Sequence, residues 1–303
     1  AEWKEEIVFF NPEKAKPADI AATAAFPDGT RPRILADRDP RAVFADWLVT
    51  PHNPWFTRNI ANRVWSWLLG RGIIHEPDDL RPDNTPSQPE LLAWLEQELA
   101  ASRYDLKHLF RQILNSQTYQ LASVPRAPSP EGAACFAHYP VRRLEAEVLI
   151  DALCLVTAST EKYSSPIPEP FTYIPEDQRS IALPDGSITS PFLELFGRPA
   201  RDTGLESERN NRPTAAQRLH LLNSSHIQRK IEQSRIVRFL SQPNHDAREI
   251  VDGLYLAILS RFPTQHEFEL AQTYSPSGTV KGRETVVDLA WALINSPEFL
   301  CRH

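Results

Sequence analysis

Apolar residues recur every three or four positions along much of this chain, which is the spacing that places side chains on one face of an α-helix. Phe56, Ile60, Val64 and Leu68 form one such stripe, and Gly70 after it favours a helix end. Comparable stripes lie within residues 91–99, 106–113, 144–155, 250–258 and 286–293. The pattern predicts a mainly α fold, a multi-helix bundle with at most minor β-hairpins.

Helix starts are marked by a Ser, Thr or Asp that stands three residues before a Glu or Gln, which is the capping-box pattern. The predicted boxes are Ser87/Glu90, Thr214/Gln217, Asp246/Glu249 and Thr264/Glu267, and Asp105 is expected to cap a helix without a box. These signals agree with the hydrophobic periodicity and place most helices after residue 40.

An Asn-Ser pair follows an apolar run three times, at Asn115, Asn223 and Asn295. Asn tolerates the left-handed conformation in which many helices end, and Ser is a good N-cap for the next helix. We interpret the pair as an abrupt break between helices. Direct chemistry at the three Asn side chains is the alternative.

Residues 158–212 lack helical periodicity and contain seven prolines between positions 166 and 199, which exclude a long helix there. A small hairpin is expected about Asp185 and Gly186. We therefore predict an irregular N-terminal arm over 1–39, with a short strand at 5–10, and a single α-helical domain over 40–303. The Pro-rich segment 158–212 is expected to pack on that domain.

Composition narrows the function classes. Hydrophobic residues make up 41% of the chain, and no window approaches the ~20 apolar residues of a membrane span. The net charge is -6 without a basic run interleaved with aromatics, so we expect no nucleic-acid partner. Cys135, Cys154 and Cys301 are too widely spaced for a structural zinc site or an attached haem, so we expect no metal and no cofactor in this chain.

The densest polar cluster lies in residues 196–213 and mixes charges of both signs between prolines and glycines. Fixed guanidinium groups in such a loop can bind a carboxylate, a phosphate or sugar hydroxyls, and an ion-pair network is the alternative. The expected ligand-binding residues are Arg198, Arg201 and Arg209. If two of Asp202, Glu206 and Glu208 lay within ~5 to 10 Å, acid/base hydrolysis of a glycoside would become conceivable, and these three are the candidate catalytic residues.

A second polar cluster follows the helix predicted at 56–69. Arg63 is expected to pair with Asp78 or Asp79, and these three residues are added to the candidate ligand-binding set. Trp65 and Trp67 could offer a surface for sugars but are expected in the core.

Two further pairs of residues are expected to have structural roles. Arg143 and Glu147 have the i,i+4 spacing of a helix-surface ion pair. His220 and His226 are expected to face different ways across the Asn-Ser break.

Five long segments follow one another over roughly residues 40–300: DPRAVFADWLVTPHNPWFTRNIANRVWSWLLGRGIIHEPDDL, PSQPELLAWL, YDLKHLFRQILNSQTYQLAS, RRLEAEVLIDAL and FGRPARDTGLESERNNRPTAAQRLHLLNS. In this order they resemble the planctomycete-specific C-terminal domain of unknown function 1553. The resemblance implies a domain that follows cytochrome-c-like modules in large exported proteins, hence an extracytoplasmic location, and implies no established reaction. The family often carries Cys-x-Cys before its Glu-Arg, whereas Leu205 and Ser207 precede Glu208 and Arg209 here.

Two functional hypotheses follow. None of the G-x-S-x-G, G-x-x-x-x-G-K, G-x-G-x-x-G or H-E-x-x-H templates is present. This favours a non-catalytic interaction or ligand-binding module of an exported multidomain protein, with a glycan or anionic ligand and neighbouring domains as partners. The alternative is a hydrolase of glycans or sulfated polysaccharides that uses carboxylates and arginines of the 196–213 loop.

Overall fold

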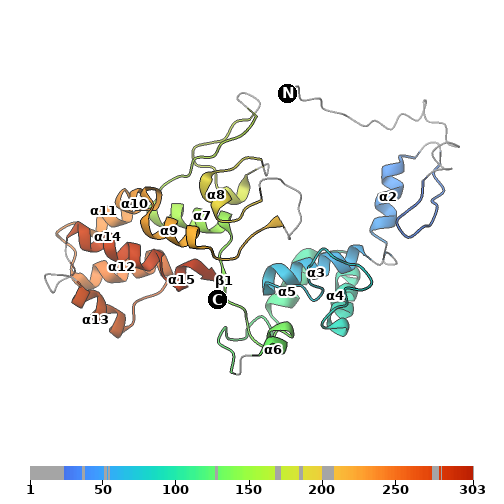
Figure 1. Ribbon diagram of the computed structural model, residues 1–303, viewed down its shortest axis with the longest axis horizontal. Helices are drawn as coiled ribbons and strands as arrows, with labels where there is room; N and C mark the ends of the chain where they lie inside the picture. Colours follow the sequence, from blue (N-terminus) through green and yellow to red (C-terminus); the bar gives the residue numbers. More distant parts are fainter. Residues whose placement is uncertain are drawn as a thin grey trace. The chain divides into compact units, whose positions relative to one another are not determined.

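The computed structural model describes residues 24–302 apart from positions 36–37, 51–52, 54, 127–128, 168–171, 184–186, 200–207, 275–279 and 281. The chain divides into two compact units, residues 1–120 and 121–303 (Figure 1). The boundary falls inside residues 40–303, for which the sequence predicted a single domain, and that prediction stays a prediction. The expected strand at 5–10 lies outside the described residues, as does the turn at 185–186.

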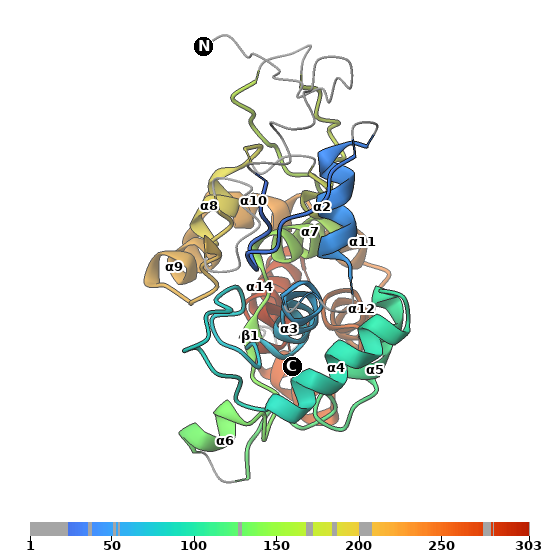
Figure 2. The ribbon, with the colours of Figure 1, turned by 90° about the vertical axis from the view of Figure 1, so that its right-hand side faces the viewer.

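The first unit is built from helices. They are α2 (Pro40–Leu48), α3 (Phe56–Leu69), α4 (Pro89–Ala101) and α5 (Leu106–Leu114). Helix α3 packs against both α4 and α5 (Figure 2). Its buried face is offset from the predicted stripe: Ala61, Trp65 and Leu69 are buried, whereas Val64 is the one stripe residue that is buried. Gly70 ends α3 in the left-handed conformation, as expected. Trp65 is buried as predicted, whereas Trp67 is 41% exposed, so its assignment to the core was wrong.

The second unit is also helical. Its elements are α6 (Pro130–Ala134), β1 (Arg142–Arg143), α7 (Ala146–Thr157), the 3₁₀ helix η1 (Ser180–Ala182), α8 (Pro191–Leu195), α9 (Ala215–Asn223), α10 (Ser225–Glu232), α11 (Arg235–Leu240), α12 (Ala247–Leu259), α13 (Gln265–Tyr274), α14 (Arg283–Ile294), α15 (Pro297–Leu300) and β2 (Cys301–Arg302). The mainly α prediction is confirmed.

The core of the second unit gathers helices that are distant in sequence. Helix α14 packs against α10, α11 and α12, and α7 packs against α8, α10 and α11 (Figures 1 and 2). The residues after α15 return to α7, because β2 pairs antiparallel with β1 just before that helix begins. Helix α7 is therefore held at its N-terminal end by the last residues of the unit.

Among their described positions, residues 158–212 contain no helix longer than the five residues of α8, in agreement with the proline content. Phe192, Leu193 and Phe196 from this segment are nevertheless buried in the core beside α7. The hydrophobic effect therefore fixes α8 on the helical body, whereas Tyr173 and Ile181 of the same segment are exposed. Packing of the whole segment on the domain stays a prediction.

Most of the predicted helix caps form in the structure. Asp105 accepts hydrogen bonds from the N–H groups of Lys107 and His108, and reciprocal boxes form at three of the four predicted pairs, namely Thr214/Gln217, Asp246/Glu249 and Thr264/Glu267. The box at Ser87/Glu90 was wrong, since the Ser87 hydroxyl donates to the Ile73 carbonyl and α4 begins after Gln88.

The Asn-Ser breaks are confirmed as helix boundaries. Ser224 and Ser296 cap α10 and α15 by accepting from the N–H groups of Ile227 and Phe299. The expectation that the Asn adopts the left-handed conformation was wrong, because Asn115 and Asn295 have φ of -84° and -88°. At Asn115 helix α5 ends but no helix directly follows Ser116, so the break joins two helices only at Asn223 and Asn295. Chemistry at the Asn side chains stays an alternative.

Candidate functional site

The charged loop 196–213 is only partly described: Arg198, Glu208 and Arg209 are placed, whereas Arg201, Asp202 and Glu206 lie outside the described residues. Glu208 is exposed. A pair of catalytic carboxylates in this loop therefore stays a prediction, as do the ligand-binding roles assigned to its arginines.

Arg198 and Arg209 converge on one carboxylate of α7. Arg209 Nη1 donates to Glu147 Oε2 at 2.7 Å and its Nη2 to Oε1 at 3.0 Å, while Arg198 Nε lies 3.4 Å from Oε1. The side chains are 9% exposed for Glu147, 10% for Arg198 and 20% for Arg209. We call these three residues the arginine clamp. Their forked geometry matches the ion-pair alternative for this loop.

Electrostatics keeps the Glu147 carboxylate charged. Burial acts to raise the pKa of Glu147, but the hydrogen bonds and charge of Arg209, with a smaller contribution from Arg198, outweigh burial and lower the pKa. Since Glu147 is bound by Arg209, its predicted helix-surface pair with Arg143 was wrong. Arg143 lies in β1, where its guanidinium donates to the Phe196 carbonyl and stacks 5.1 Å from the Phe196 ring.

The two stems of the loop meet beside the clamp. The Asn210 N–H donates to the Gly197 carbonyl at 3.0 Å, and Gly197 has φ of +91°. A Cβ at position 197 would lie 1.9 Å from the Asn210 carbonyl oxygen, so glycine is required there by both conformation and space. The loop base is thus closed by backbone contact as well as by the clamp.

In the first unit, Arg63 pairs with Asp78 as predicted, with Arg63 Nε 2.5 Å from Asp78 Oδ1. Asp79 instead binds Arg81. Their ligand-binding roles stay a prediction.

Beside this pair, the buried Asn62 side chain holds the turn after α3. Its amide donates to the carbonyls of Ile74 and Pro77, and its oxygen accepts from the Ile74 N–H. These contacts give the cluster a structural role that the sequence did not reveal.

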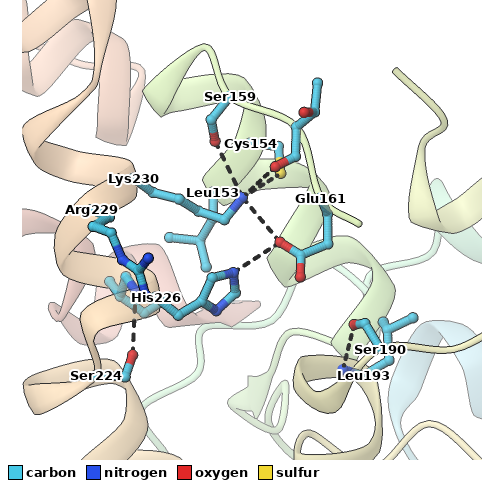
Figure 3. Close-up of polar contacts among 12 residues, drawn as sticks. Leu153, Cys154, Ser159, Glu161, Ser190, Leu193, Ser224, His226, Arg229 and Lys230 are labelled. Carbon is cyan, nitrogen blue, oxygen red and sulfur yellow. Dashed lines mark hydrogen bonds and ion pairs between the residues drawn. The ribbon is translucent and has the colours of Figure 1, made fainter. Parts of the chain in front are cut away.

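A different polar cluster lies in the second unit between the turn after α7 and helix α10. The Lys230 ammonium, whose side chain is 8% exposed, lies 3.0 Å from Glu161 Oε2 and donates to the Thr160 carbonyl at 2.7 Å (Figure 3). It also contacts Ser159 Oγ at 3.3 Å and Cys154 Sγ at 3.4 Å. The buried ammonium thus has four contacts with oxygen and sulfur atoms of this chain.

His226 binds the same Glu161 oxygen as Lys230. Its Nε2 lies 2.9 Å from Glu161 Oε2, and its Nδ1 lies 3.3 Å from Nε2 of His220, so the expectation that the two His face different ways was wrong. Burial lowers the pKa of His220, with the neighbouring His226 acting in the same direction. Because both ring nitrogens of His226 are engaged within the chain, neither is left to bind a substrate.

Around this cluster the surface is hollowed into an open groove of about 780 Å³. The groove is lined by Ala158, Ser159, Thr160, Glu161, Lys162, His226, Arg229, Lys230, Gln233, Arg235 and Arg238. We call it the basic groove. Lys230 and Glu161 form its floor, and the exposed cations Lys162, Arg229, Arg235 and Arg238 form its rim.

The cluster lacks the features of a reactive thiol or a metal centre. Burial raises the pKa of Cys154, against the opposing effect of Lys230, so its thiol is disfavoured as a nucleophile. Among the residues that the structure describes, no three His, Cys, Asp or Glu side chains are grouped to hold a metal ion. Within the same residues, no helix is long and apolar enough to cross a membrane.

Comparison with protein families assigns the chain to a family. A family model described as protein of unknown function (DUF1553) matches residues 40–275, well over half of the sequence. The chain belongs to this family. No curated protein and no solved structure matches it. The DUF1553 match includes both the arginine clamp and the basic groove.

Sequence reasoning missed the basic groove of this DUF1553 chain. Its walls come from residues 158–162 and 226–238, which are separated by more than 60 positions and contain no recognised motif. The detectable signal was the run of cations from Arg229 to Arg238, where Arg235 and Arg238 have the i,i+3 spacing of one helix face.

Proposed function

We propose that this chain is a non-catalytic ligand-binding module that takes an anionic ligand in the basic groove. The observation that carries the proposal is the charge of the groove lining: among the described lining residues, five are Lys or Arg and one, Glu161, is a carboxylate. That carboxylate is already bound by Lys230 and His226. The rim cations are therefore left to attract an anion from solution.

Two features support binding rather than catalysis. Both nitrogens of His226 are engaged within the chain, and the Lys230 ammonium contacts oxygen and sulfur atoms of the chain. A general acid or base needs a proton-transferring atom that can reach the substrate. The titratable side chains of Glu161, Lys230 and His226 instead form hydrogen bonds and ion pairs with one another.

The hydrolase alternative is not supported by a comparable observation. Its candidates Asp202 and Glu206 lie outside the described residues, and Arg198 and Arg209 bind Glu147. We therefore base the proposal on the basic groove and not on the 196–213 loop.

An NMR titration with inorganic sulfate and inorganic phosphate tests the proposal. We expect saturable shifts of backbone amides in residues 158–162 and in α10 and α11, because a bound oxyanion changes their electrostatic environment. The double variant Arg235→Ala/Arg238→Ala should weaken this response several-fold. Arg218→Ala, an exposed arginine of α9 outside the groove lining, is the control and should bind as the wild type. Shifts that survive unchanged in the double variant would refute the proposal.

The wider context of the proposal rests on the family resemblance. We extend it to a module of a larger exported planctomycete-type protein in an extracytoplasmic location, with a cytochrome-c-like module as a neighbouring partner and a polysaccharide as one candidate ligand. Fractionation of cells that produce the full-length protein tests the location. Recovery of the protein in the cytoplasmic fraction would refute that extension and leave the groove proposal standing.

A further inference from the structure

We infer that the ligand of the basic groove is a linear polymer that carries repeated sulfate or phosphate groups. This inference rests on the function proposed above and names its ligand class. It is drawn from the distribution of the rim cations, the lack of local compensation for their charge, and the chemical character of the lining.

The rim cations are spread along the groove and come from three segments. Lys162 belongs to the turn after α7, Arg229 to α10, and Arg235 and Arg238 to successive positions on one face of α11. A site for one small anion would gather its donors around a single point. Cations supplied by three separate segments instead match a ligand with several charged groups.

The rim charge is not cancelled within the groove. Arg229 donates to the Ser225 carbonyl and hydroxyl, and Arg238 to the Gln233 carbonyl, so the described partners of both are neutral. Within the described part of the chain, no ion pair joins Lys162 or Arg235 to a carboxylate. This local excess of positive charge lies on a chain whose net charge is -6.

The lining determines the kind of polymer. No Phe, Tyr or Trp occurs among the described lining residues, so the groove has no platform on which sugar rings or nucleobases could stack. Three of the four rim cations are arginines, whose planar forks donate two hydrogen bonds to one oxyanion. Recognition must therefore depend on the charged groups of the polymer and not on its rings.

The exposure of the rim side chains also favours a polymer over a single ion. The groove is open, and Lys162, Arg229, Arg235 and Arg238 are all exposed, whereas only the floor residue Lys230 is buried. Exposed cations bind single ions weakly, because each contact is screened by water and salt. Several such contacts along one polymer add together through release of counterions.

The test measures binding of the whole chain to dextran sulfate and to polyphosphate, with uncharged dextran as the matched control polymer. We expect at least one polyanion to bind at least tenfold more tightly per charged group than inorganic sulfate or phosphate. A plot of log K against log salt should have a slope of about -3, since roughly 0.7 counterions are released per contact for four rim cations.

Variants connect this binding to the rim. Arg235→Ala/Arg238→Ala should reduce the magnitude of the salt slope by about 1.4, whereas Arg218→Ala should leave the slope unchanged. Binding of dextran sulfate alone identifies a sulfated polymer, binding of polyphosphate alone identifies a phosphate polymer, and either result supports the inference.

The contrary outcomes separate the two proposals. If inorganic sulfate or phosphate saturates the groove and both polymers bind no better per charged group, the polymer inference is overturned and the proposed function stands. If neither the ions nor the polymers bind at the groove, both fail. Equal binding of uncharged dextran would also overturn the inference, because it would show recognition that does not depend on charge.

Discussion

The arginine clamp and the basic groove use the same residue types to opposite effect. In the clamp, Arg198 and Arg209 are mostly buried on Glu147 and hold the base of a loop. In the groove, Arg235 and Arg238 are exposed, and Glu161, the one carboxylate among the described lining residues, is bound by Lys230 and His226. The difference shows that a guanidinium group indicates function only when its partner is known.

The two regions also differ in the energetic cost of removing one charged residue, because the clamp is buried and the groove rim is exposed. Removing a partner from the clamp leaves charges in a poorly hydrated site, where the cost is large. Removing a cation from the groove rim leaves solvent-exposed neighbours that water already stabilises. We therefore expect clamp variants to change stability and rim variants to change binding.

Glu147→Gln should have the largest effect on stability. The substitution removes the charge that compensates Arg198 and Arg209, and we expect a loss of about 3 to 5 kcal/mol in the free energy of unfolding of the second unit. The urea dependence of amide hydrogen exchange in α7 measures it. Glu194→Gln, at an exposed position of α8, is the control and should change stability by less than about 0.5 kcal/mol. A loss of similar size in both variants would remove the distinction between clamp and surface.

Lys230→Met tests whether the groove floor behaves like the clamp. The variant keeps an apolar stem but removes the ammonium that lies on the buried Glu161 carboxylate and leaves His226 as the remaining described side-chain partner, so we expect a loss of about 3 kcal/mol. Lys162→Met, on the exposed rim of the same groove, should cost less than about 0.5 kcal/mol. Chemical denaturation of both variants provides the comparison. A floor variant as stable as the rim variant would show that Lys230 is not part of the structural framework.

Gly197→Ala examines the loop base independently of charge. The added Cβ would meet the Asn210 carbonyl in a left-handed backbone conformation, so we expect a loss of about 2 to 3 kcal/mol. Gly282→Ala is a matched control, because Gly282 has φ of +89° with open space around its Cβ position. Its ψ of 154° lies in a region that only glycine populates readily, so it should lose about 1 to 2 kcal/mol from conformational strain alone, less than Gly197→Ala. Thermal unfolding midpoints that fall equally in the two variants would contradict a close contact between the loop stems.

The pH dependence of stability tests whether the ionised Glu147 carboxylate of the clamp stabilises the fold. Because the folded-state pKa of Glu147 is lower than that of the unfolded chain, the unfolded state binds more protons at acidic pH. The stabilisation by this carboxylate is present above its ordinary pKa of 4.5 and is lost as pH falls through the folded-state pKa. The stability difference between wild type and Glu147→Gln should therefore shrink as pH falls below about 4.5. Urea titrations at successive pH values measure this difference, and one that stays constant into acid would contradict the mechanism.

Local sequence signals determined the helices of this protein and most of their ends. The caps at Asp105, Thr214 and Asp246 were predictable because a capping side chain bonds to N–H groups two or three residues away. The pairing of Arg63 with Asp78 was also within reach, since a short turn joins the helix to the aspartate. Such interactions depend on few residues and are therefore visible in the chain itself.

Only the tertiary structure decided which charged residues meet. Arg209 binds a glutamate 62 positions earlier, and Lys230 contacts a turn about 70 positions earlier, because α7 packs against both α8 and α10. Local spacing had instead paired Arg143 with Glu147 and separated His220 from His226. The sequence by itself thus determined the helical class and the abundance of charge. Packing of the hydrophobic core decided which charges are buried in partnership and which remain at the rim of the groove, because burial sets the energetic need for a partner.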